Sequence, residues 1–101
     1  MSIIFVFVDG VGLAPRGADN PLSNAPTPTI ERLLGGMLTI EQTGMLPTAL
    51  LQPLDATLGI DGLPQSGTGQ TALLTGVNAA QLHGRHQPHF PPVALRPLLA
   101  E

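Results

Sequence analysis

The apolar run near the start of this 101-residue sequence constrains its fold more than any other feature. Residues 3–8 read Ile-Ile-Phe-Val-Phe-Val, and every one of them is β-branched or aromatic. The absence of polar alternation is typical of a strand buried on both faces of a parallel sheet. We name residues 3–8 the apolar segment and predict that it forms a central strand. It is followed by Asp9-Gly10-Val11-Gly12, where the glycines permit a sharp change of direction.

The rest of the sequence predicts short elements separated by turns, since glycine and proline are abundant (12 and 11 residues). Residues 13–26 hold three prolines and form a loop too long to be a simple connector. Patterns and caps predict helices at 27–34, 68–75 and 78–82, a helix-like segment at 93–101, and short strands at 38–42 and near 49–52. Leu73 and Leu74 are expected to face the core.

Composition narrows the class of protein. Hydrophobic residues make up 43% of the chain, enough for the core of one ordinary domain. Four arginines, no lysine and a net charge of -3 argue against a nucleic-acid-binding surface or a basic membrane anchor. The apolar segment is too short for a membrane span or a signal peptide, and the chain lacks cysteine. We expect a cytoplasmic α/β domain.

Asp9 is the first candidate for chemistry. Ligands of open α/β sheets gather outside the carboxyl ends of the strands, and the predicted strand ends at Asp9. A carboxylate in that place suits a divalent metal ion or a general base. The alternative is a structural aspartate in a turn or helix cap.

The second candidate is the glycine-rich stretch at residues 62–71, which reads Gly-Leu-Pro-Gln-Ser-Gly-Thr-Gly-Gln-Thr. A glycine-rich turn leading into a helix presents backbone N–H groups at the positive end of the helix dipole, which favours an anion. Ser66 is expected at the cap with its hydroxyl facing the ligand, or else as an ordinary helix cap. A nucleotide-binding P-loop is disfavoured, because Pro64 replaces its first glycine and Gln70 replaces its lysine.

Three stretches together resemble a known family. They are residues 5–12, residues 18–33 with Ala-Asp-Asn-Pro and Ala-Pro-Thr-Pro-Thr-Ile-Glu-Arg-Leu, and Ser-Gly-Thr-Gly-Gln at 66–70. They are similar to the opening of cofactor-independent phosphoglycerate mutases and phosphopentomutases, members of the alkaline phosphatase superfamily. The resemblance runs with gaps over residues 3–76. Gln70 departs from the mutases' histidine, and the stretch is closer to bacterial relatives described only as metalloenzyme domains.

The resemblance implies a fold and a set of roles. The fold is α/β, the N-terminal portion of a three-layer core built around a parallel sheet, over residues 1–101. Asp9 and Ser66 would ligate one of two divalent ions, manganese or zinc, and Ser66 would be the nucleophile. Asn20 and the backbone of Gly67, Thr68 and Gly69 would bind the substrate, a small phosphate ester. Asp19 would lie near the same site.

The family completes its metal site with aspartates and histidines from a C-terminal half, so a missing half or a partner chain is expected to supply them. The three residues His83, His86 and His89 lie in a proline-containing loop and are disfavoured as substitutes. Two other interpretations stay open: a non-catalytic module that binds an anion or nucleotide through the glycine-rich loop, and an inactive fragment.

Overall fold

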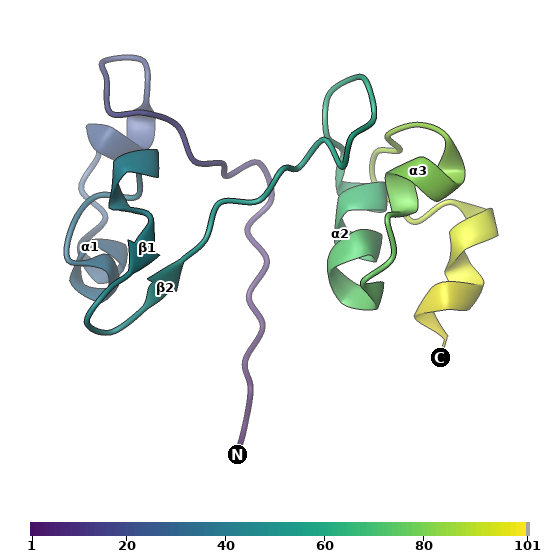
Figure 1. The fold of residues 1–101 in the computed structure, drawn as a ribbon, viewed down its shortest axis with the longest axis horizontal. Coiled ribbons are helices and arrows are strands. Elements are labelled where there is room, and N and C mark those ends of the chain that lie inside the picture. The colour runs from purple at the N-terminus through teal and green to yellow at the C-terminus, as the bar shows by residue number, and fades with distance from the viewer. Residues whose placement is uncertain (101) are drawn as a thin grey trace. The chain divides into compact units, whose positions relative to one another are not determined.

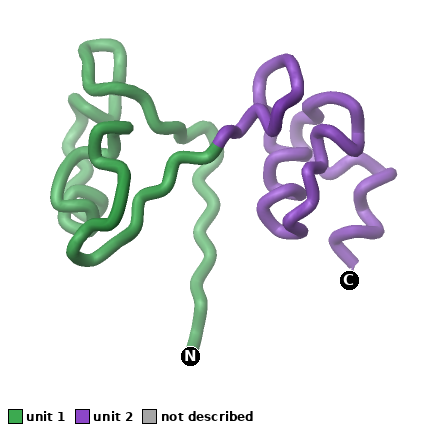
Figure 2. Tube along the Cα trace, in the orientation of Figure 1, with its two compact units in different colours: residues 1–54 green, residues 55–101 purple. Residues whose placement is uncertain are grey.

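The computed structural model describes residues 1–100, which are mostly helix and coil (Figure 1). By contact they divide into two compact units, Met1–Leu54 and Asp55–Glu101, which we describe separately (Figure 2). Helices and strands follow in the order η1 (Pro21–Ser23), α1 (Pro28–Leu34), η2 (Ile40–Gln42), β1 (Gly44–Met45), β2 (Leu50–Leu51), α2 (Ser66–Thr75), α3 (Ala79–His83) and η3 (Val93–Leu99), where η marks a 3-10 helix.

The predicted parallel-sheet core is wrong. Over residues 1–100 the strands are β1 and β2, which pair antiparallel with Gly44 opposite Leu51. The apolar segment is extended but pairs with neither strand, and its side chains are exposed, Ile3 by 87% and Val6 by 73%. A strand forms only where a neighbour takes up its N–H and C=O groups. Among the described residues β1 and β2 pair only with each other, so the apolar segment has no such neighbour and the three-layer α/β prediction fails.

In the first unit, α1 agrees with its sequence signals. The backbone N–H of Thr27 donates to the Glu31 carboxylate at 2.6 Å, which closes the first turn. The helix ends at Gly35, whose φ of 69° is the left-handed conformation that glycine adopts without strain. Leu34 is buried, and its carbonyl accepts a hydrogen bond from the Gln42 side chain at 2.8 Å. The helix predicted at residues 27–34 is confirmed.

The two strand predictions in this unit had different outcomes. The strand expected near 49–52 is confirmed as β2, which pairs with β1. The strand expected at 38–42 is wrong, because residues Ile40–Gln42 form the 3-10 helix η2. The Ile40 N–H donates to the carbonyl of Ala14, a residue of the long loop, instead of to a neighbouring strand.

In the second unit, α2 packs against α3 and η3 through small and polar residues. Leu73 and Leu74, predicted to face the core, are 50% and 63% exposed. The buried side of α2 is instead formed by Gly67, Thr68 and Thr71, whose small size allows close packing. The remaining core consists of Ala79, Ala80 and Leu95.

The helix boundaries in this unit follow local signals. Gly76 ends α2 with a φ of 72°, as predicted, but the helix begins at Ser66, ahead of Thr68. The helix predicted at 78–82 is confirmed as α3, and Asn78 caps it by accepting the Gln81 N–H at 3.0 Å. The segment predicted at 93–101 is the 3-10 helix η3 over Val93–Leu99, and its last residue lies outside the described residues.

None of the helices in residues 1–100 has the length and apolar character that a membrane crossing requires.

Candidate functional site

Ser66 is the first residue of α2, and its hydroxyl is not used to cap the helix. The sequence predicted Ser66 at the cap, but the N-cap is Gln65, whose side chain makes no capping hydrogen bond. Ser66 is half-buried. Within residues 1–100 its hydroxyl has no hydrogen-bond partner, in contrast to the hydroxyls of Thr68 and Thr71. The Ser66 hydroxyl is therefore available to a ligand.

The backbone N–H groups of the first turn of α2 are partly occupied. The Gly69 N–H makes the first helical bond, to Gln65 O at 2.9 Å. The Thr68 N–H donates to Gln87 O at 3.2 Å, and the Gln87 N–H donates back to Thr68 Oγ1 at 3.2 Å. In the described part of the chain, the N–H groups of Ser66 and Gly67 have no acceptor. Of the three predicted backbone donors at 67–69, only the N–H of Gly67, a buried residue, lacks an acceptor in the described chain, and the N–H of half-buried Ser66 adds a second.

The loop at residues 87–90 lies directly against the start of α2. A Cβ on Gly67 would stand 2.6 Å from both Gln87 O and Phe90 O, closer than atoms can approach. A Cβ on Gly69 would meet nothing within 4 Å. Gly67 is thus required for packing, whereas Gly69 leaves open space beside the helix. No sequence motif indicated that Gln87 and Phe90 border this site.

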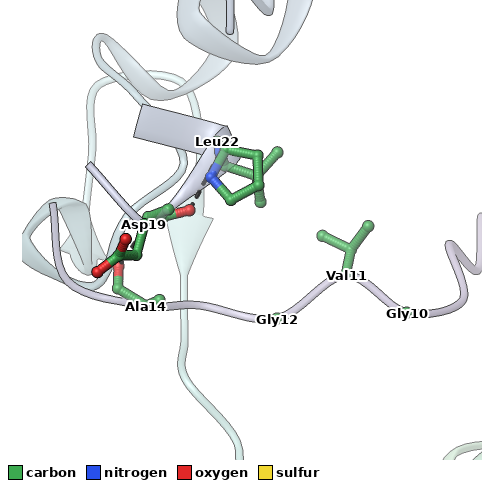
Figure 3. A pocket seen from close by; sticks show the side chains of 8 residues that line it. Gly10, Val11, Gly12, Ala14, Asp19 and Leu22 are labelled. Carbon is green, nitrogen blue, oxygen red and sulfur yellow. Dashed lines mark hydrogen bonds between the residues drawn. The ribbon is translucent and has the colours of Figure 1, made fainter. Parts of the chain in front are cut away.

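In the first unit, the glycine-rich turn after the apolar segment borders a shallow depression (Figure 3). Gly10 takes a φ of 73°, which glycine tolerates. Asp9 is an exposed residue of the same turn and does not line the depression. The lining residues are Gly10, Val11, Gly12, Ala14, Asp19, Asn20, Pro21 and Leu22.

Asn20 holds the long loop in shape. Its side-chain N–H groups donate to Ala14 O at 3.2 Å and Pro15 O at 3.0 Å, and its oxygen accepts the Leu22 N–H at 3.0 Å. The residue is only 7% exposed. A substrate contact at Asn20 would have to replace one of these bonds, so its observed role is structural, and its predicted role in substrate binding stays a prediction.

Glu41 also stabilises this loop through hydrogen bonds. The Glu41 carboxylate oxygens accept the Arg16 N–H at 3.0 and 3.2 Å. This backbone hydrogen bond is the main reason why the pKa of Glu41 lies below its usual value. The ionised carboxylate is therefore the form that holds the loop.

Asp9 and Ser66, the two predicted metal ligands, belong to different units, and their joint site stays a prediction. No group of three or more His, Cys, Asp or Glu side chains suited to a metal ion occurs within residues 1–100. The histidines have separate surroundings. The His86 Nε2 lies 3.2 Å from Ile60 O, the His83 Nε2 is buried without a partner in the described chain, and His89 is exposed.

Comparisons with protein-family models, with curated proteins and with solved structures found no match to this chain.

Proposed function

We propose that this chain supplies the nucleophile of a metal-dependent phosphoryl-transfer or phosphate-ester hydrolysis site, and that the nucleophile is Ser66. The observation that carries the proposal is the free Ser66 hydroxyl at the first turn of α2, beside the unpartnered N–H groups of Ser66 and Gly67. A serine that only capped the helix would have its hydroxyl bonded to a backbone N–H.

The start of α2 suits a phosphate group without help from lysine. The N–H groups of Ser66 and Gly67 would donate to phosphate oxygens, and the helix dipole adds partial positive charge at this end. The open space beside Gly69 gives a substrate room to approach. In the proposed reaction the Ser66 hydroxyl gives its proton to water and its Oγ bonds to phosphorus, while the bond from phosphorus to the leaving oxygen breaks and that oxygen takes up a proton from water. Water, or the hydroxyl of an acceptor, then displaces Ser66 Oγ from phosphorus, and Oγ regains a proton.

The proposed cofactors are two divalent ions, manganese or zinc. Asp9 and Ser66 fit as oxygen ligands of one ion by their chemistry, since one is an exposed carboxylate and the other has a free hydroxyl. A bound divalent ion lowers the pKa of a hydroxyl that it coordinates. Two ligands are fewer than such sites use, so we further propose that a C-terminal half or a partner chain contributes the others.

A non-catalytic anion-binding module is the second candidate, and the same two free N–H groups favour it. It requires neither Asp9 nor a metal ion. Binding of phosphate that is unchanged by metal removal and by Asp9→Asn supports the module over the enzyme.

The proposal is tested by hydrolysis of p-nitrophenyl phosphate by the full-length gene product, with manganese or zinc and after chelation. We expect metal-dependent turnover that Ser66→Ala abolishes. Ser2→Ala is the matched control, because Ser2 is an exposed serine that makes no hydrogen bond in the described chain. Turnover that survives Ser66→Ala would remove Ser66 as the nucleophile.

A further inference from the structure

Thr68 is a buried residue that joins the first turn of α2 to the loop at residues 87–90. It is 0% exposed. Its N–H donates to Gln87 O and the Gln87 N–H donates to its Oγ1, both at 3.2 Å, so a reciprocal pair of hydrogen bonds links the two residues. The Thr68 hydroxyl also donates to Gln65 O at 3.4 Å, a longer bond to the residue just before Ser66. One side chain therefore contacts both the loop and the backbone that leads into Ser66.

The loop at residues 87–90 is held by contacts on both sides of it. Before the loop, His86 Nε2 lies 3.2 Å from Ile60 O. After it, Arg96 Nε donates to Pro91 O at 3.3 Å. Three prolines within residues 88–92 restrict the rotation of the backbone there. Thr68 is thus bonded to a segment whose position is set by contacts other than its own.

We propose that Thr68 is a positioning residue, whose hydroxyl holds the first turn of α2 so that Ser66 Oγ is directed toward phosphorus. This inference rests on the proposed function, because it concerns the same nucleophile. The Ser66 hydroxyl makes no hydrogen bond in the described chain, so its direction is set by the backbone that carries it. A displacement of about 1 Å in a reacting group can cost about a hundredfold in rate. Thr68 acts through that backbone, since its own N–H is bonded to Gln87 O.

Thr71 is the residue that separates positioning from stability. It lies on the same helix and is 1% exposed, so it is as buried as Thr68. Its hydroxyl donates to Gly67 O at 2.7 Å, a bond within α2. Valine in place of either threonine keeps the shape of the side chain and removes one buried hydroxyl. Only the change at Thr68 removes a bond between α2 and the loop.

Amide hydrogen exchange of the 101-residue chain measures the positioning without turnover. Thr68→Val should raise the exchange rates of the N–H groups at position 68 and of Gly69 at least about tenfold, because the first turn of α2 loses a bond to the loop. Thr71→Val is the matched control and should change these two rates less. Exchange that is unchanged by Thr68→Val, or raised equally by both variants, overturns the proposal.

Steady-state hydrolysis of p-nitrophenyl phosphate by the full-length gene product tests the effect on the nucleophile. Thr68→Val should lower kcat at least about tenfold and change KM less than about threefold, because a misaligned nucleophile slows the chemical step more than it weakens binding. Thr68→Ser keeps the hydroxyl and should restore kcat, and Thr71→Val should leave kcat unchanged. A kcat that Thr68→Val does not lower, or that both valine variants lower equally, overturns the positioning role.

Ser66→Ala in the same assay distinguishes failure of this inference from failure of the proposed function. If Ser66→Ala abolishes turnover and Thr68→Val has the kcat of the unmodified protein, the positioning role alone is overturned. If turnover survives Ser66→Ala, Ser66 is not the nucleophile, and both the proposed function and the role of Thr68 in it are overturned. Loss of turnover in Ser66→Ala, together with a lower kcat in Thr68→Val that Thr68→Ser restores, supports both.

Discussion

The apolar segment and α2 both depart from the burial that their composition suggests. The apolar segment is exposed, whereas α2 buries polar residues. The segment is wholly apolar, yet its Ile3 and Val6 are 87% and 73% exposed. In α2, the polar Thr68 and Thr71 are 0% and 1% exposed. The difference lies in the backbone. A helix satisfies its own N–H and C=O groups, whereas a strand needs a neighbour, and the described residues provide none for the segment.

The threonines of α2 tolerate burial because their hydroxyls have local acceptors. Thr71 Oγ1 donates to Gly67 O at 2.7 Å, one helical turn earlier. A buried polar group that is hydrogen-bonded costs little, and a small side chain lets α3 approach. In these two segments, burial therefore depends more on whether the backbone and side-chain hydrogen bonds can be completed than on hydrophobicity.

Among the variants that test this packing, Gly67→Ala is expected to lower the free energy of unfolding most. The added methyl would stand 2.6 Å from Gln87 O and Phe90 O, so the loop at 87–90 must move, at a cost of about 2 kcal/mol in the free energy of unfolding. Chemical denaturation followed by circular dichroism measures it. Gly69→Ala is the control, because its methyl meets nothing within 4 Å, and a gain of about 0.5 kcal/mol is expected. Equal losses in the two variants would contradict the packing described for α2.

Thr71→Val has a smaller expected effect. It keeps the shape of the side chain but removes the buried hydroxyl, and we expect a loss of about 1 kcal/mol in the free energy of unfolding. Thr75 makes the same kind of bond, to Thr71 O at 2.7 Å, and also accepts the Val77 N–H at 3.2 Å, but it is only half-buried. Thr75→Val should cost less, because water can replace the lost bond. If the Thr71 variant is as stable as the unmodified chain, its hydroxyl does not explain the burial.

The predictions from sequence were correct for elements whose ends are determined by neighbouring residues in the chain. Gly35 and Gly76 end α1 and α2 because the chain turns there into a left-handed conformation that glycine adopts readily. The sheet could not be predicted in this way, since strand pairing depends on a distant partner. The prediction that Leu73 and Leu74 face the core was wrong because it also depended on a contact with another element. In the structure α3 packs on the small residues of α2 instead.

The candidate site was predicted only in part. The glycine-rich stretch correctly indicated a helix beginning close to Ser66, because such turns leave N–H groups unpaired at a helix start. The sequence did not reveal that Gln87 would occupy the Thr68 N–H, since that contact joins residues far apart in the chain. The sequence also did not reveal that the Asn20 side chain makes its hydrogen bonds within its own loop.

Amide chemical shifts of the 101-residue chain test whether the start of α2 binds phosphate, as we propose. On titration with inorganic phosphate, with and without zinc, we predict the largest shifts at the N–H groups of Ser66 and Gly67. The Thr68 N–H, already bonded to Gln87 O, should move less. If Ser66 and Gly67 shift no more than the exposed Ser2 under both conditions, the claim is contradicted.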